Sequence, residues 1–171
     1  CYNTFMNCTL KSLTFVLAIF YFHIDVIAES NPHQFIDSQA QEMVSIIRNN
    51  QALYTNEPEL FKDKINTVFE PMVDFRRVSA SVMGKENYLK SSTEQRSEFI
   101  EVFKNSLLDT YASTLAQWGD QKIVTNFSNK TTFEKVEDVN QDLLTESNSY
   151  PITYKVRKSG EGWKIINIIV N

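Results

Sequence analysis

Hydrophobic residues recur at helical spacing through the first half of the chain. Between Pro32 and Tyr54, one face of an expected helix carries Ile36, Ala40, Met43, Val44 and Ile47. These positions follow the i, i+4, i+7, i+8 spacing of an amphipathic helix. A second helix is expected to begin near Asn56. Glu59 follows Asn56 by three residues, as in a capping box, and Pro58 lies between them.

The apolar stripe of this second helix is interrupted by proline and ends at glycine. Apolar residues recur on one face from Phe61 to Met72, and Pro71 is expected to kink or break the helix. The pattern restarts at Phe75, and Gly84 is expected to cap the C-terminal end of that segment.

A capping motif at Ser92 predicts the start of a further helix. Gln95 follows Ser92 by three residues, which is the arrangement of a capping box. Five apolar residues then form one line that Trp118 continues: Ile100, Phe103, Leu107, Tyr111 and Leu115. We therefore expect one long helix from Ser92 to Trp118.

The remainder of the chain is richer in strand patterns. Segment 121–128 and a part of segment 131–144 are each expected to form a strand, and 150–158 alternates apolar and polar residues most clearly. A turn at 159–162 leads to a last strand, 163–170, which is apolar on both faces and is therefore expected to be covered on both sides. Helices followed by strands predict an α+β domain.

The first 28 residues have the pattern of a signal peptide. Lys11 precedes an apolar run from Leu13 to Ile24, and Ala28 provides a small residue before a cut. The run is shorter than the roughly 20 residues that a membrane-spanning helix needs. We expect a cleaved signal peptide over 1–28, with residues before Met6 lying upstream of the true start, and a single domain over 29–171. An uncleaved membrane anchor is the alternative.

Composition and charge remove several classes of function. The net charge is −4 and no run of Lys or Arg forms a basic stripe, which argues against nucleic acid as a partner. Both cysteines precede the expected cut, so the mature domain would form no disulfide. His33 is the one histidine after the cut, and we expect a surface or capping role for it rather than metal ligation. We expect no cofactor.

Carboxylates are the remaining candidates for catalysis. Four cluster in the second strand region: Glu134, Glu137, Asp138 and Asp142. Asp74 lies beside Arg76 and Arg77. Buried carboxylates with separated pKa values can perform general acid–base chemistry, whereas a solvated strand or loop is the plainer interpretation. A periplasmic acid–base enzyme that uses a buried acid such as Asp74 stays open as an alternative.

An ordered set of short features runs through the middle and end of the chain. It consists of Pro71, Asp74-Phe75, Gly84, Tyr88, Gln95-Arg96, Phe99, Phe103, Leu107, Thr110-Tyr111, Tyr150-Pro151-Ile152, 155–158 and Gly162-Trp163-Lys164-Ile165. This set resembles the MlaC / toluene-tolerance family of periplasmic phospholipid-binding proteins. The resemblance implies N-terminal helices packed on a curved antiparallel four-stranded sheet, in a nuclear-transport-factor-like or cystatin-like layout.

The resemblance also implies a function without catalysis. Family members carry a phospholipid by its acyl chains through the periplasm, between an inner-membrane ABC transporter complex and an outer-membrane lipoprotein–porin complex. They continue past the last strand into further helical sequence, so we expect the domain to be truncated at its C-terminus. A periplasmic adaptor with a filled core is the second alternative to the carrier, beside the acid–base enzyme.

Mapped onto this chain, the resemblance implies a lipid-binding wall and a sheet floor. The helical wall would consist of Val73, Phe75, Val78, Val82, Phe99, Phe103, Leu107 and Tyr111. The sheet floor would consist of Tyr154, Val156, Ile165 and Ile169. Apolar stripes that fill a core and stripes that line a cavity have the same spacing, so periodicity alone does not separate the two.

Overall fold

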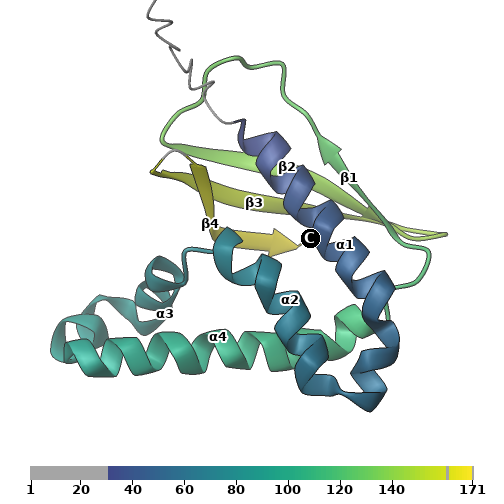
Figure 1. Ribbon diagram of the computed structural model, residues 1–171. Coiled ribbons are helices and arrows are strands. Elements are labelled where there is room, and N and C mark those ends of the chain that lie inside the picture. Colours follow the sequence, from purple (N-terminus) through teal and green to yellow (C-terminus); the bar gives the residue numbers. More distant parts are fainter. Residues whose placement is uncertain (1–30, 161, 171) are drawn as a thin grey trace, which may run out of the picture.

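Four helices are followed by one four-stranded antiparallel sheet (Figure 1). The computed structural model describes residues 31–160 and 162–170, so the expected signal peptide lies outside the described residues. The elements are α1 (Pro32–Asn56), α2 (Pro58–Met72), α3 (Phe75–Lys90), α4 (Thr93–Ala116), β1 (Lys122–Asn126), β2 (Val136–Leu144), β3 (Ser149–Ser159) and β4 (Gly162–Val170). The strands lie in the order β1-β2-β3-β4, and the predicted α+β class is confirmed. Of the helices described, none is long and apolar enough to cross a membrane.

Helix α1 lies across one face of the sheet (Figure 1). Asn31 caps its start, since its side-chain oxygen accepts from the backbone N–H of His33 at 2.8 Å. The expected cap of the next helix at Asn56 is wrong, because Asn56 stays in the last turn of α1. The backbone N–H of Glu57 bonds the carbonyl of Leu53 at 2.7 Å, and α2 begins at Pro58 without a side-chain cap.

The junction between α2 and α3 docks on the edge strand β4. Pro71 lies in the last turn of α2, which ends one residue later. Val73 then forms a parallel bridge with Ile165, and the backbone N–H of Asp74 donates to the carbonyl of Ile165 at 2.9 Å. Asp74 also caps α3, since its carboxylate accepts from the backbone N–H of Arg77 at 3.0 Å. This carboxylate is therefore used in local structure.

Gly84 marks a kink and not the end of α3. Its φ of 74° and ψ of 155° fall in a region that is essentially restricted to glycine. The chain resumes helical geometry after Gly84 and continues to Lys90, beyond the helix end that was expected at Gly84. The glycine was correctly identified as a break, but the short helical segment after it was missed.

Substituting Gly84 by alanine is expected to destabilise the fold through the backbone alone. No heavy atom lies within 4 Å of a Cβ placed there, so the cost of about 1–3 kcal/mol comes from the disfavoured φ and ψ. Gly162 is a matched control, because its surroundings are equally open and its φ is not positive. Urea unfolding should show a loss for Gly84→Ala well above that for Gly162→Ala; equal losses would contradict this assignment.

Helix α4 begins as the sequence predicts. The Ser92 hydroxyl accepts from the backbone N–H of Gln95 at 3.2 Å, and the Gln95 side chain accepts from the backbone N–H of Ser92 at 2.9 Å. The capping box is therefore confirmed. Further along, the largely buried Lys104 binds Glu70 of α2 at 3.1 Å. Figure 1 shows that α3 and the first half of α4 extend beyond the sheet, whereas the end of α4 lies near α1.

The two halves of β4 differ in burial. Trp163 and Ile165 are buried, with 3% and 1% of their surface exposed, whereas Ile168, Ile169 and Val170 are exposed. The prediction that this strand is covered on both sides is therefore wrong for its C-terminal half. The reason is its position: β4 is an edge strand of the sheet, and the α2–α3 junction meets it only around Ile165.

Two apolar clusters hold the layers together. The larger joins the sheet to α1, α2 and α3, and its members include Ile36, Val68, Val139, Val156 and Ile165. The smaller joins α2 to α4 through Phe61, Ile65 and Ala112. The helices are thus fixed to the sheet by one cluster and to one another by the second.

Candidate functional site

An apolar cavity of about 200 Å³ lies between α1, the C-terminal end of α4 and the sheet. Helix α1 contributes more of its apolar lining than any other element: Ile36, Ala40, Met43, Val44 and Ile47. This set is the whole apolar stripe that the sequence places on the first helix. Because helical spacing puts these residues on one face, the sequence itself builds this wall of the cavity.

The sheet closes the cavity opposite α1. Four side chains from three neighbouring strands contribute: Ile123, Leu143, Ile152 and Tyr154. Residues two apart in a strand share a face, so Ile152 and Tyr154 of β3 both point toward the helices. Leu143 of β2 lies on the same side. The sheet therefore offers an apolar floor that spans β1 to β3.

Few polar groups reach this cavity. The indole Nε1 of Trp118 is buried and has no hydrogen-bond partner within the described part of the chain. Burial raises the pKa of the Tyr154 hydroxyl to about 12, so this group stays neutral at physiological pH. Gln39 adds an amide. Such a lining accepts apolar groups and offers a small number of neutral hydrogen-bonding groups to an attached ester or alcohol.

The volume of the cavity sets what it holds without movement. Ligand pockets for drug-sized molecules enclose about 300–1,000 Å³, and an apolar cavity of about 150 Å³ holds benzene. A space of about 200 Å³ therefore accepts a short apolar segment. A long hydrocarbon chain requires α1 and the sheet to separate further.

The twelve residues expected to contact lipid lie in different surroundings. Five are buried in the larger core cluster: Val73, Phe75, Tyr154, Val156 and Ile165. Three are partly buried against it: Val78, Phe103 and Leu107. Phe99 stacks on Phe103, with ring centroids 6.1 Å apart. The core of this chain thus uses most of the expected wall and floor for packing between its layers.

The remaining three expected residues face outward. Val82, Tyr111 and Ile169 are 57%, 54% and 43% exposed. Tyr154 is the member of the expected set that lines the apolar cavity; the other eleven, all among the described residues, do not line it. Their contact with lipid stays a prediction.

Sequence reasoning did not assign the α1 stripe to the site. The signal was present in the regular spacing of Met43, Val44 and Ile47, but a packed stripe has the same spacing. What distinguishes the two is the position of Leu115 and Trp118, which lie more than 60 residues further along the chain and complete the cavity. Local periodicity carries no information on such distant neighbours.

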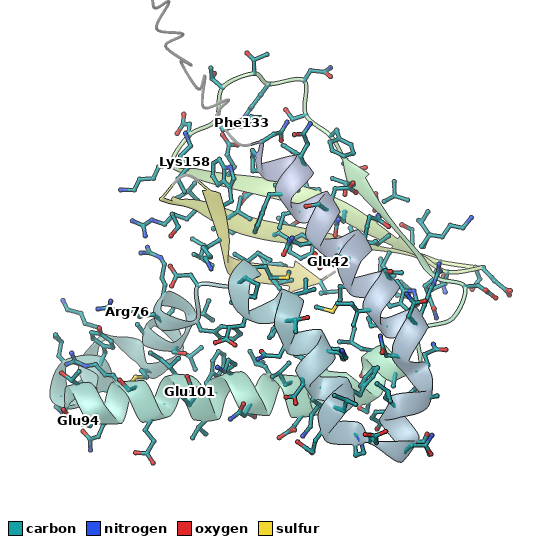
Figure 2. The ribbon with its side chains drawn as sticks, in the orientation of Figure 1. Glu42, Arg76, Glu94, Glu101, Phe133 and Lys158 are labelled. Atoms are coloured by element: carbon teal, nitrogen blue, oxygen red, sulfur yellow. The ribbon has the colours of Figure 1, made fainter. Side chains whose placement is uncertain are left out.

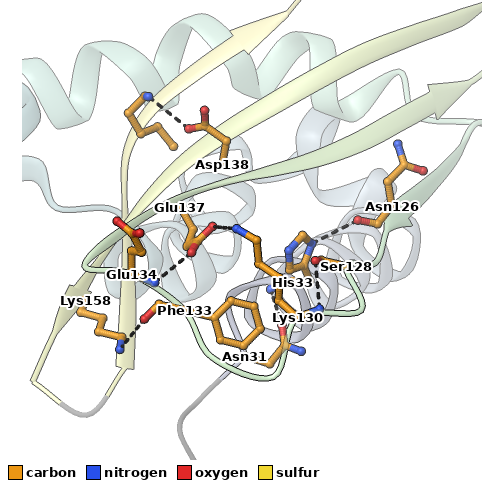
Figure 3. Close-up of polar contacts among 11 residues, drawn as sticks. Asn31, His33, Asn126, Ser128, Lys130, Phe133, Glu134, Glu137, Asp138 and Lys158 are labelled. Carbon is orange, nitrogen blue, oxygen red and sulfur yellow. Dashed lines mark hydrogen bonds and ion pairs between the residues drawn. The ribbon is translucent and has the colours of Figure 1, made fainter.

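Of the four clustered carboxylates, Glu137 and Asp138 have structural partners that Figure 3 shows, and Asp142 accepts from the Asn126 amide at 3.0 Å. Glu137 is 9% exposed and accepts from the backbone N–H of Glu134 at 2.9 Å and from the Lys130 ammonium at 3.1 Å. Asp138 pairs with Lys155 at 3.1 Å. In residues 31–160 and 162–170, no group of three or more His, Cys, Asp or Glu side chains is arranged to hold a metal ion.

His33 is buried, so the expected surface position is wrong. Its exposed fraction is 6%, and its Nδ1 lies 3.1 Å from the carbonyl oxygen of Asn126 in β1 (Figure 3). Its ring also contacts Phe133, with centroids 6.2 Å apart. Phe133 in turn meets Trp163 edge to face. His33 therefore joins the start of α1 to the loop between β1 and β2.

The bonds to Glu137 predict a loss of stability in acid. The Glu134 backbone N–H, followed by the Lys130 ammonium, holds the pKa of the Glu137 carboxyl below its ordinary value of 4.5. Since the folded-state pKa is the lower one, this stabilisation is complete above about pH 4.5 and is lost as the pH falls through the folded-state pKa. Glu137→Gln should cost about 1–2 kcal/mol at pH 7 and much less at pH 3.

Glu134→Gln is the matched control for this prediction. The Glu134 side chain is exposed, so its substitution should change the free energy of unfolding by no more than about 0.5 kcal/mol. Urea denaturation at both pH values measures the difference between the two variants. A cost for Glu137→Gln that is the same at pH 3 as at pH 7 would contradict the role given to the carboxylate.

Residues 37–171 match the family model described as MlaC protein. The chain belongs to this family. The match covers most of the chain, including the apolar cavity apart from Ile36. The resemblance found in the ordered features from Pro71 onward is thereby confirmed.

Two relatives are similar in sequence to this MlaC-family chain, at moderate identity. The toluene tolerance protein ttg2D of Pseudomonas putida is 28% identical over 151 residues, which cover 88% of this chain and 70% of that protein. The intermembrane phospholipid transport system binding protein MlaC of Haemophilus influenzae is 26% identical over 162 residues, which cover 92% of this chain and 75% of the relative.

A solved structure has the same fold as this MlaC-family chain. It is the phospholipid-binding protein from Ralstonia solanacearum in complex with a phospholipid. The TM-score is 0.75 at 20% identity, over 83% of this chain and 79% of the other. At this identity the likeness establishes the arrangement of helices and sheet. The match agrees with the α+β architecture described above.

Proposed function

We propose that this chain is a periplasmic carrier that binds phospholipid by its acyl chains. The cavity between α1 and the sheet receives the end of an acyl chain, and α1 moves away from the sheet as the rest enters. The expected wall and floor residues, from Val73 to Ile169, become contacts in that wider state. No covalent step is involved.

The apolar cavity is the observation that carries this proposal. It is lined by side chains of α1, α4 and three strands, and its polar groups are neutral. Membership of the MlaC protein family adds support, since a relative of this chain is named as a phospholipid transport system binding protein. A family fold alone would not assign a function, but the cavity gives the assignment a physical basis.

Transfer of acyl chains explains why an enclosed apolar space is needed. Each methylene group removed from water is worth about 0.8 kcal/mol, so a long chain does not cross an aqueous space unprotected. A carrier lowers this barrier by offering apolar surface throughout the transfer. In this proposal the chain receives lipid from one membrane complex and delivers it to another: an outer-membrane lipoprotein–porin complex and an inner-membrane ABC transporter complex.

A filled-core adaptor is the second candidate. The observation in its favour is the volume of about 200 Å³, which is too small for two long acyl chains as it stands. The adaptor would use the same helices and sheet as a rigid scaffold. It predicts that the cavity never opens and that no lipid accompanies the protein.

Lipid extraction separates the two candidates. The purified protein is extracted with organic solvent, and the extract is quantified by mass spectrometry against protein concentration. The carrier predicts about one phospholipid for each chain, or uptake of labelled lipid from phosphatidylglycerol–phosphatidylethanolamine vesicles. Absence of both lipid and uptake would refute the carrier and favour the adaptor.

A further inference from the structure

A second cavity of about 400 Å³, with both polar and apolar lining residues, lies between α3 and the first half of α4. Six of its lining residues carry polar groups: Arg76, Ser79, Tyr88, Thr93, Arg96 and Ser97. It is far from the apolar cavity. Ile100 and Leu115 line the two cavities on the same helix, and 15 residues of α-helix span about 22 Å. The proposed acyl-chain site does not account for it.

Ser79 provides a buried hydroxyl without a partner in this cavity. Its exposed fraction is 1%, and its Oγ makes no hydrogen bond within the described residues. A buried hydroxyl without a partner costs about 1–3 kcal/mol. A serine on an interior helix turn would normally bond a backbone carbonyl of the preceding turn. The Oγ is closed to water in this structure, so a small movement of the surrounding side chains would let it donate to a ligand in the cavity.

Arg96 is held in place by the chain and keeps free donors. Its Nε donates to the carbonyl of Tyr88 at 2.9 Å, and one terminal nitrogen donates to the carbonyl of Ser91 at 2.8 Å. The guanidinium also lies over the Tyr88 ring, 4.2 Å from its centroid. No bond of the other terminal nitrogen is found among the described residues. The charge is thus fixed at the cavity with three of its five N–H donors uncommitted.

The rest of the lining adds positive potential and no carboxylate. Arg76 of α3 makes no ion pair or hydrogen bond in the part of the chain that the structure describes, and Figure 2 shows it at the end of the molecule where α4 starts. Thr93 is the first residue of α4, where the helix dipole favours an anion. Glu94 does not line the cavity, but its carboxylate is bonded to its own backbone N–H and to Ser92 at this helix end, so the main attraction for an anion comes from the two arginines.

We propose that the cavity between α3 and α4 is an anion-binding site that takes a phosphate group. Arg76 and Arg96 supply the charge, and the Ser79 hydroxyl donates from the buried side. Planar guanidinium donors match phosphate oxygens well, and the cavity has room for the substituent that a phosphate ester carries. The phosphate belongs either to a lipid head group or to a small soluble phosphate compound.

Titration of the purified protein with inorganic phosphate, followed by NMR of backbone amides, tests the site. We expect saturable shifts at residues of α3 and the start of α4 at low millimolar phosphate. Arg76→Gln and Ser79→Ala should each weaken the affinity by about fivefold or more, because each removes a donor to a charged group. Both variants should fold, since the Arg76 side chain is exposed and Ser79→Ala removes an unbonded hydroxyl.

Arg77→Gln is the matched control. It removes the same charge from the adjacent position, but Arg77 does not line the cavity. The affinity of this variant for inorganic phosphate should therefore stay within twofold of that of the unsubstituted protein. Equal weakening by Arg77→Gln would overturn the proposal, because it would show a general effect of net charge. Absence of saturable shifts, or unchanged affinity in both Arg76→Gln and Ser79→Ala, would also overturn it.

Dihexanoyl phosphatidylglycerol, used below its micelle concentration, identifies the source of the phosphate. If the site takes a lipid head group, Arg76→Gln and Ser79→Ala weaken the binding of both this lipid and inorganic phosphate. If the site takes a soluble compound, the two substitutions weaken the binding of inorganic phosphate but not that of the lipid. Either result supports the site. The inorganic phosphate titration uses no acyl chain, so its failure would leave the proposed carrier function standing, and absence of carried lipid would leave this site standing.

Discussion

Replacing Ala40 by tryptophan is expected to reduce phospholipid retention more than tenfold. Ala40 lies on the α1 wall of the apolar cavity, and an indole placed there fills a space of about 200 Å³ before an acyl chain enters. Overpacking should cost about 1–3 kcal/mol of stability, so the variant is expected to fold. Phospholipid per chain after purification, quantified by mass spectrometry, measures the effect.

Ala52→Trp is the control for this substitution. Ala52 lies on the same helix but is exposed and does not line the cavity. It should retain lipid as the unsubstituted protein does. Full lipid retention by Ala40→Trp, with the fold checked by circular dichroism, would show that acyl chains bind elsewhere.

Phe61→Ala is expected to produce the largest loss of stability, about 3–5 kcal/mol. Phe61 is fully buried and belongs to the cluster that joins α2 to α4. It also meets the ring of Tyr54 in α1 edge to face, with centroids 5.7 Å apart. Its removal therefore leaves a cavity where three helices meet. Since small domains are stable by about 5–15 kcal/mol, urea unfolding should show a much lower midpoint.

Leu60→Ala provides the comparison for this loss. Leu60 is the adjacent residue, is 38% exposed and belongs to neither core cluster. Its substitution should cost less than about 1 kcal/mol. Similar costs for the two variants would mean that the three helices do not depend on the cluster around Phe61.

Local patterns predict most helices and strands of this chain because their signals lie within a few residues. The α1 stripe, the capping box of Ser92 and Gln95, and the alternation along β3 each depend on near neighbours. The cap expected at Asn56 failed for a related reason. Helix α1 continues through Asn56, so this residue cannot also cap the start of α2, although the local sequence matches a capping motif.

Burial of particular residues was harder to predict, since it depends on distant parts of the chain. His33 is buried by contact with Asn126, 93 residues away. The exposed end of β4 follows from the order of strands in the sheet, which the apolar pattern of β4 itself does not contain. The apolar cavity is a third case, because Met43 and Val68 both lie on apolar helical stripes, but Met43 lines the cavity and Val68 is buried in the larger core cluster.

Contacts between acyl chain and protein test the central claim most directly. Methyl-labelled protein loaded with phosphatidylglycerol can be examined by NMR for nuclear Overhauser effects from lipid methylene protons. The carrier with its cavity between α1 and the sheet predicts such effects at the methyl groups of Met43, Ile47 and Ile152. Effects confined to exposed methyl groups outside the expected wall and floor, such as those of Val102 and Val124, or none at all, would contradict it.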